Sequence, residues 1–312
     1  MKRPQGISLF GMIAIVLILI SVAFVILMLI GQAVGVMLFS KPCIAEVKVS
    51  GEIIDQAPET SIFSPEPPPT ASEIIELIDF ANNRSDVKAI VLYVDSPGGE
   101  VIPSREIYER VKNSQKPVVA YFRSTAASGG YYVAVGADYI VSEPETITGS
   151  IGVRATSLSL SGLFDRLGIN YTNVVSGELK DMGDVNHNLT EKERAIFQSI
   201  IDEVFNEFKT TVYENRHGRP RFSDEKFNEV LDARILTGRQ AYEIGLVDEL
   251  GNKDRAFEKA AELAGVQEYT KCEMTPNRGV FSSLLEELTK PIQVNVNLNM
   301  GLLEKNVEVK YT

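Results

Sequence analysis

Cysteine and histidine, the residues that form disulfides and bind many metals, are scarce in this sequence. It contains two cysteines and two histidines among 312 residues. Cys43 and Cys272 form neither a CxxC pair nor a zinc-binding pattern, which excludes a disulfide framework. A single bridge between them is possible, but we expect both to be free thiols. The chain is long enough to bury a hydrophobic core without metal or disulfide staples.

Basic residues are also fewer than acidic residues. The chain carries 42 acidic and 31 basic residues, and its formal net charge is −11. Because phosphate binding needs a basic surface, this excess of acid argues against nucleic acid as a partner. It is typical of an acidic globular body instead.

Charge is missing altogether between Gly6 and Ser40. The apolar run exceeds the roughly 20 residues that a helix needs to cross a bilayer, and it is longer than a secretory h-region of about 7–15 residues. We therefore expect an uncleaved transmembrane anchor at residues 9–39. Lys2 and Arg3 favour a short cytoplasmic N-terminus, residues 1–8, and an extracytoplasmic body. The expected location is the cell membrane, with a single crossing.

The rest of the chain alternates between strand-like and helix-like segments. The continuous β-branched run at 87–94 is typical of a strand that is buried on both faces. Capping boxes that begin at Thr70 and Thr190 predict the starts of two helices. The expected strands cover residues 43–54, 87–94, 116–122, 138–143 and 169–176. This alternation predicts βαβ units and a mostly parallel sheet.

We interpret residues 40–268 as one α/β domain behind the anchor. Within it, the proline-rich segment 55–70 is expected to be a mobile surface loop. Residues 269–312 form a C-terminal extension. Its tail alternates with period two, so a strand and an extended arm both remain open.

Two glycine-rich segments, "DSPGGE" (95–100) and "STAASGGYY" (124–132), are predicted to be strand-to-helix turns. Such turns gather at the carboxyl ends of parallel strands, where ligands bind in α/β folds. Glycines permit close backbone approach, and helix N-termini leave N–H groups unpaired, which are the ingredients of an oxyanion hole. Neither segment has the glycine spacing of a nucleotide-phosphate loop.

Ser128 is the best-placed nucleophile because two glycines follow it at the turn. The other hydroxyls near these turns belong to Ser96, Ser124 and Thr125. A serine needs a base to activate it. Local sequence leaves the choice open between a catalytic serine and an ordinary small residue in a turn.

The candidate bases are the two histidines and Lys180. His187 and His217 lie in polar segments that are typical of surface loops, which disfavours a Ser-His-Asp triad. Lys180 lies in "VVSGELKDMGD" and must be neutral to act as a base. The neighbouring Glu178 and Asp181 favour its charged form, so the residues alone do not assign the base.

Five motifs in a fixed order carry a family resemblance. They are "DSPGG" (95–99), "AASGGYY" (126–132), "TGSIGV" (148–153), "SGxxKxxG" (176–183) and "LTGRQAYEIGLVDELG" (236–251). In this order behind an N-terminal anchor, they resemble the signal peptide peptidase A family of membrane-anchored serine proteases. The resemblance covers roughly residues 44 to 268.

The resemblance implies a ClpP/crotonase-like α/β fold of stacked βαβ units, with one N-terminal transmembrane helix. It also implies a Ser-Lys dyad. The implied site residues are Ser128 as nucleophile, Lys180 as general base, Ser150 as the group that orients the lysine, and Gly129, Gly98 and Gly99 at the oxyanion hole. After the lysine motif, "DVNHNLTEKE" departs from the proline- and arginine-containing segment of many relatives, which bears on pocket shape.

The implied activity is that of an endopeptidase that degrades residual signal peptides and other unstructured hydrophobic segments. Its implied partners are peptide substrates, the lipid bilayer and further copies of the chain in a ring-shaped homo-oligomer, with catalytic residues meeting at subunit interfaces. No metal, nucleotide or other cofactor is expected. The alternatives are a stomatin-associated protease of the same fold, a crotonase-fold acyl-CoA enzyme, and a catalytically silent membrane scaffold.

Overall fold

The computed structural model describes residues 17–28, 41–56, 67–276 and 308–311. The chain forms two units, Met1–Pro42 and Cys43–Thr312. In the first unit, residues 17–28 form a helix whose apolar side chains are exposed. Within the described ranges, no helix has both the length and the apolar composition that a membrane crossing requires. The rest of the predicted anchor and most of the predicted loop at 55–70 lie outside the described residues.

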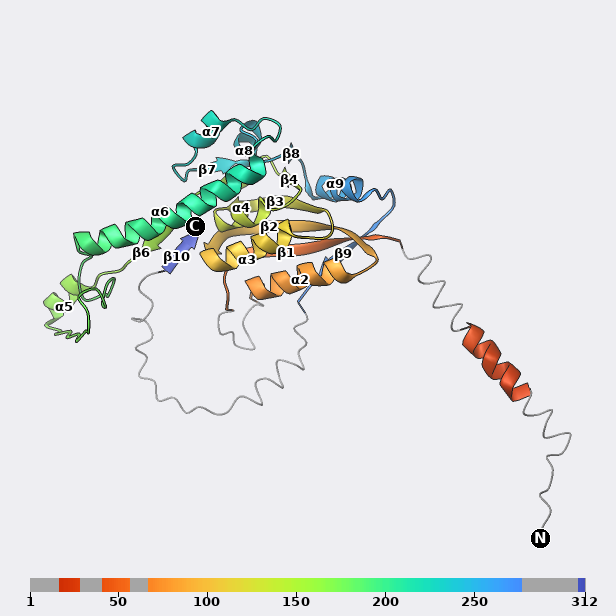
Figure 1. Ribbon diagram of the computed structural model, residues 1–312, viewed down its shortest axis with the longest axis horizontal. Coiled ribbons are helices and arrows are strands. Elements are labelled where there is room, and N and C mark those ends of the chain that lie inside the picture. Colours follow the sequence, from red (N-terminus) through yellow and green to blue (C-terminus); the bar gives the residue numbers. More distant parts are fainter. Residues whose placement is uncertain (1–16, 29–40, 57–66, 277–307, 312) are drawn as a thin grey trace, which may run out of the picture. The chain divides into compact units, whose positions relative to one another are not determined.

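A parallel sheet forms the centre of the second unit (Figure 1). Neighbouring strands pair in the order β9–β1–β2–β3–β4–β8, and every pair in this series is parallel. The strands are β1 (Cys43–Ile53), β2 (Val87–Glu100), β3 (Val118–Ala127), β4 (Tyr139–Ser142), β8 (Glu249–Leu250) and β9 (Thr270–Met274). The predicted α/β fold with a mostly parallel sheet is confirmed.

Helices cover both faces of this sheet. Along β2, Leu92 and Val94 belong to the core beneath one set of helices, whereas Val91 belongs to the core on the opposite face. Both sets are fully buried, as the β-branched run predicted. The first face carries α2 (Ala71–Asn83), α3 (Val101–Lys112) and α4 (Gly129–Ala134), and the second carries α9 (Lys253–Ala264) (Figure 1).

The carboxyl ends of β2 and β3 run on into a second group of strands. The end of β3 pairs with β5, and β5 pairs antiparallel with β7. The end of β2 pairs antiparallel with β10, and β10 pairs antiparallel with β6. These strands are β5 (Ile147–Gly149), β6 (Arg154–Thr156), β7 (Ile235–Thr237) and β10 (Glu308–Tyr311).

The prediction of a turn at "DSPGGE" is wrong, because β2 continues as a strand to Glu100. Glu52 and Ile53 of β1 pair with Gly98 and Gly99, so the partner strand holds this segment extended. The glycines therefore lie in a strand whose outer edge faces β10. Local turn residues predicted the break, and a long-range pairing overrides it.

The remaining helices are α5 (Ser161–Leu167), α6 (Glu191–Arg216), α7 (Asp224–Glu229) and α8 (Gly238–Glu243). The capping boxes predicted at Thr70 and Thr190 are present at the starts of α2 and α6. Figure 1 shows α5 beyond the N-terminal end of α6, away from the central sheet. The strand predicted at 169–176 is wrong, since these residues pair with no strand in the described part of the chain and Val174 is 92% exposed. A segment in which apolar and polar residues alternate forms a strand only where the edge of a sheet lies beside it.

Cys43 and Cys272 form a disulfide, so the expectation of free thiols is wrong. The bridge joins β1 to β9, two directly paired strands, and the two Cα atoms lie 6.0 Å apart. The cysteines are 229 positions apart in sequence, and only the sheet register brings them together. The segment 269–312 thus supplies both β9 and β10 to the fold.

Candidate active site

Ser128 stands between the end of β3 and the start of α4 with an unusual backbone conformation. Its φ and ψ are 53° and −120°. A positive φ is uncommon and strained for a residue that has a Cβ. Backbone hydrogen bonds fix this conformation, because the Ser128 N–H donates to the Gly149 carbonyl (2.9 Å) and the Tyr132 N–H donates to the Ser128 carbonyl (2.8 Å). The predicted strand-to-helix turn at Ser128 is confirmed.

The Ser128 side chain is buried without a partner. The residue is 0% exposed, and its Oγ has no hydrogen-bond partner in the part of the chain that the structure describes. An unsatisfied buried hydroxyl costs about 1–3 kcal/mol. The strain in the backbone and the unsatisfied hydroxyl fall on one residue, a combination that points to function.

The two glycine-rich segments meet beside Ser128. A methyl group placed on Gly129 would lie 3.1 Å from the Gly99 nitrogen and 3.2 Å from the Gly98 Cα. The backbones are therefore in contact, and this closeness needs glycine at position 129. The Gly98 N–H is already occupied, since it donates to the Ser96 Oγ (3.1 Å). Gly129 and Gly99 are the better candidates for donors to an oxyanion.

Ser104 of α3 also belongs to this site, although the sequence analysis did not single it out. It is fully buried, and its Oγ donates to the Glu100 carbonyl (2.7 Å). The same Oγ would lie 2.6 Å from a methyl group on Gly129. Ser104 thus packs between the end of β2 and the turn at Ser128. Its position depends on how α3 packs against α4, which no local signal in the sequence reveals.

Ser150 directly follows β5, as Ser128 follows β3. Ala127 at the end of β3 pairs with Gly149 at the end of β5, and each serine is the residue after that pair. Ser150 is buried and also has a positive φ, 51°. Its N–H donates to the Arg234 carbonyl (3.0 Å), which holds this second strained turn in place.

Lys180 does not join Ser128 within one chain. Its side chain is exposed and forms no ion pair or hydrogen bond with any residue in the described ranges. Its N–H donates to the Gly177 carbonyl (3.0 Å) in the turn that follows the exposed segment after α5. The structure therefore brings together the serines and glycines of the predicted site but leaves the lysine apart.

The histidines are held by other groups. The His187 Nε2 lies 3.1 Å from the Glu193 Oε1, and its Nδ1 lies 2.6 Å from the Asn186 Oδ1. The His217 Nδ1 lies 3.4 Å from the Asp224 Oδ1. Neither ring is a hydrogen-bond partner of Ser128, so the geometry holds no Ser-His pair.

Helix α4 is anchored by buried tyrosines. The Tyr131 hydroxyl donates to the Leu246 carbonyl (2.8 Å), and the Tyr132 hydroxyl lies 3.4 Å from the Thr211 Oγ1. Burial raises the pKa of the Tyr131 phenol, so this group stays a neutral donor. These contacts hold the short helix, and with it Ser128, against α6 and the core.

The chain matches the model of peptidase family S49 over residues 110–267 and that of Clp protease over residues 58–145. Both matches include Ser128. The chain is 35% identical over 278 residues to a predicted protease of Methanocaldococcus jannaschii, covering 85% of this chain and 88% of that protein.

Two further relatives are also named as peptidases. A predicted signal peptide peptidase A of Enterococcus faecium is 33% identical over 243 residues, 77% of this chain and 69% of that protein. Protease 4 of Haemophilus influenzae is 29% identical over 269 residues, 83% of this chain but 42% of that protein. With a buried, strained serine inside the matched region, this chain belongs to peptidase family S49, the signal peptide peptidase A family of serine proteases.

Proposed function

We propose that the protein is a membrane-anchored endopeptidase that uses a Ser128–Lys180 dyad. The observation that carries this proposal is the buried Ser128 hydroxyl, which has no hydrogen-bond partner among the described residues. Its strained turn lies against Gly98 and Gly99 at the end of β2, here called the glycine strand. Such a hydroxyl is free to give its proton to a base. Lys180 supplies the base in this mechanism.

The chemistry is acyl transfer in two steps. The Ser128 Oγ attacks the scissile carbonyl carbon while the neutral Lys180 amine accepts the hydroxyl proton. The carbonyl oxygen becomes an oxyanion and accepts hydrogen bonds from the Gly129 and Gly99 N–H groups. The Lys180 ammonium then gives its proton to the leaving amine, and water hydrolyses the acyl-serine ester.

We assign the lysine to a neighbouring copy of the chain. Lys180 is exposed at the end of residues 158–180, the α5 arm, where large apolar side chains are also exposed. These side chains are Leu158, Leu163, Leu167, Ile169, Tyr171, Val174 and Val175. Groups of exposed apolar side chains mark interaction surfaces. In the proposed ring-shaped homo-oligomer, the arm of one copy carries Lys180 to Ser128 of the next, where Ser150 orients the amine.

Such an interface also takes the Lys180 amine out of water. Burial of an amine disfavours its charged form. In the single chain Lys180 is exposed, so the dyad becomes complete only on assembly.

The substrates are extended, hydrophobic peptides, including residual signal peptides. The strand β10 already pairs antiparallel with β2 at Gly99 and Glu100 and with β6 at Arg154–Thr156. The slot between β2 and β6 therefore accepts an extended chain by main-chain pairing. A substrate takes the place of β10, with its scissile bond directed to the glycine strand and Ser128.

We place the catalytic body outside the cytoplasm, behind an anchor at residues 9–39. The uncharged sequence before Lys41 and the exposed apolar side chains of the helix at 17–28 support the anchor. The Cys43–Cys272 disulfide supports the location, because such bridges persist in oxidising compartments.

The test is hydrolysis of an apolar reporter peptide by Ser128→Ala and Lys180→Ala proteins. Each variant alone should lose activity, with His187→Ala as the control that keeps it. If the two variants are assembled together at equal amounts, a shared dyad restores activity at about a quarter of the sites, because each working site draws its serine and lysine from different copies.

Near wild-type turnover by Lys180→Ala would remove the lysine from the mechanism. Loss of activity in His187→Ala alone would replace the dyad by a triad. If fluorophosphonate fails to label Ser128 in the assembled protein, the chain is a silent scaffold and not a protease.

A further inference from the structure

A cavity of about 250 Å³ lies between β6 and the first turns of α6. Its lining residues are Val153, Arg154, Ala155, Thr156, Ser157, Leu189, Arg194, Phe197, Gln198 and Ile201. The strand β6 follows Ser150 closely in the chain and also forms one edge of the slot that β10 occupies. The cavity therefore lies beside the proposed path of the substrate.

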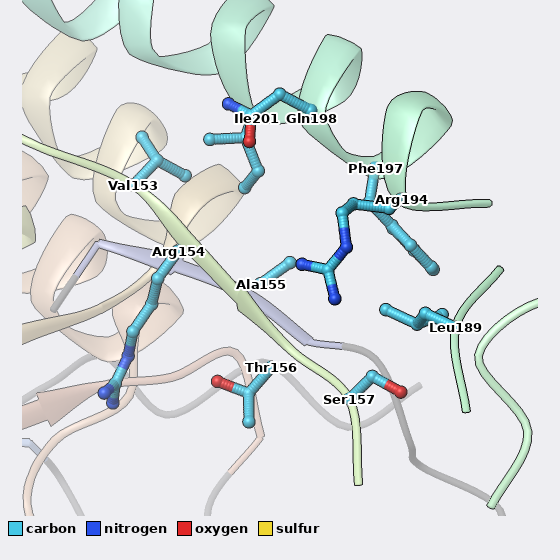
Figure 2. Close-up of a pocket in the computed structure, with 10 residues that line it drawn as sticks. All are labelled: Val153, Arg154, Ala155, Thr156, Ser157, Leu189, Arg194, Phe197, Gln198 and Ile201. Carbon is cyan, nitrogen blue, oxygen red and sulfur yellow. The ribbon is translucent and has the colours of Figure 1, made fainter. Parts of the chain in front are cut away.

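The charge of this lining is opposite to that of the whole chain. Two arginines and no acidic residue line the cavity, although the chain carries a net charge of −11. Neither guanidinium forms an ion pair or a hydrogen bond with any residue in the described part of the chain. Figure 2 shows Arg194 reaching from α6 toward β6 beside Leu189, whereas Arg154 extends along the other side of the strand. A side chain with a carboxylate at the end of an apolar stem fits such a cavity. The carboxylate pairs with the guanidinium, and the stem packs against the apolar lining residues.

The strand register determines which residue of a bound substrate faces this cavity. Side chains alternate along a strand, so Val153, Ala155 and Ser157 share one side of β6. Residues directly opposite each other in an antiparallel pair share a face. A substrate residue opposite Ala155, the register position that Val309 holds in β10, therefore faces the cavity. Since β10 runs toward Gly99 at its carboxyl end, that residue lies N-terminal to the scissile bond.

We infer that Arg194 is a specificity-determining residue, which selects a glutamate or aspartate at the substrate position opposite Ala155. The inference rests on the proposed function, because it places the substrate in the slot of β10. Val153 and Phe197 receive the methylene stem, and the Arg194 guanidinium receives the carboxylate. Arg154 is the neighbour of Ala155 in β6, so its side chain lies on the other side of the strand and does not duplicate this role (Figure 2).

The experiment compares apolar peptides that differ only in carrying Glu, Gln or Lys at successive positions before the cleaved bond. With the full-length protein, kcat/KM should favour Glu over Gln by about two- to five-fold at the position opposite Ala155, the size expected of an exposed ion pair. Arg194→Gln should abolish this preference, and Arg194→Glu should reverse it in favour of Lys. Lys209→Gln removes a positive charge from α6 outside the cavity and should leave the preference unchanged.

Binding to Ser128→Ala protein, measured by fluorescence anisotropy of the same peptides, separates this inference from the mechanism. If binding depends on Arg194 while wild-type protein cleaves no peptide, the subsite is confirmed and the proposed protease mechanism is wrong. If peptides are cleaved but Arg194→Glu and wild type show the same charge preference at every position, Arg194 does not select the substrate. Arg194→Gln serves if the charge reversal perturbs folding.

Discussion

At the scale of single residues, the site is organised by strain that neighbouring strands hold in place. Ser128 and Ser150 both have positive φ, and each has its N–H bound to a carbonyl of an adjacent segment. Backbone in this region costs of order 1–3 kcal/mol per residue, so it persists only where the surroundings determine it. The pair of strained serines directs two hydroxyl-bearing residues to one place.

Gly129→Ala tests the contact between the turn and the glycine strand. The new methyl would lie 2.6 Å from the Ser104 Oγ and 3.1 Å from the Gly99 nitrogen, so the turn must shift. We expect kcat to fall about 10- to 100-fold, because small displacements of reacting groups have such effects. Peptide hydrolysis measures the loss, and urea unfolding measures the accompanying change in stability.

The double variant Gly129→Ala/Ser104→Ala provides the internal control. Removing the Ser104 hydroxyl relieves the closest contact, so part of the lost kcat should return. If Gly129→Ala retains full activity, the close packing at this turn has no catalytic role.

At the scale of elements, the sequence predicts what local signals determine. The capping boxes at Thr70 and Thr190 and the β-branched run in β2 are local, and the structure confirms all three. The strand predicted at 169–176 depends on a partner edge, and the extension of β2 through Gly99 depends on β1. The Ser128 turn could be predicted from its glycines, whereas Ser104 depends on helix packing.

Glu193, at the start of α6, makes the stability of the protein depend on pH. Burial alone would raise its pKa, but hydrogen bonds from the Thr190 backbone and from His187 outweigh this and hold the pKa below its usual value. A lowered carboxylate pKa contributes stability above the unfolded value of 4.5, and this contribution is lost as pH falls through the folded value. Glu193→Gln should therefore destabilise the protein by about 1 kcal/mol near neutral pH and by less in acid, because the hydrogen bonds to a charged carboxylate are weakened.

The measurement is urea unfolding of wild type and Glu193→Gln from pH 7 to pH 3. Glu191→Gln, an exposed acid in the same first turn, is the matched control and should show a smaller difference. A difference between wild type and Glu193→Gln that stays constant across this range would contradict the assigned role.

At the scale of the whole molecule, one disulfide joins β1 and β9, which come first and last in chain order among the strands of the parallel sheet. The Cys43–Cys272 bridge spans 229 positions and lies between β1 and β9. Cross-links that close long loops restrict the unfolded chain most, and removing a native bridge typically costs about 2–5 kcal/mol. The bridge therefore stabilises the unit as a whole more than it stabilises any one helix.

Cys43→Ser/Cys272→Ser should lower the free energy of unfolding by about 2–5 kcal/mol in urea. A thiol reductant should shift the wild-type midpoint in the same direction and leave that of the double variant unchanged. If reductant does not move the wild-type midpoint, the bridge contributes nothing to stability.

Under the proposed function, the strand β10 has a consequence for which peptides reach the site. It belongs to the same chain as the slot it fills, so it competes with a free peptide as a tethered ligand. A linked segment acts at an effective concentration that its linker sets. A peptide free in solution must therefore pair with the slot much more strongly than β10 does, or reach a comparable local concentration. Segments held at a membrane surface meet the second condition, so competition with β10 favours them over peptides in solution.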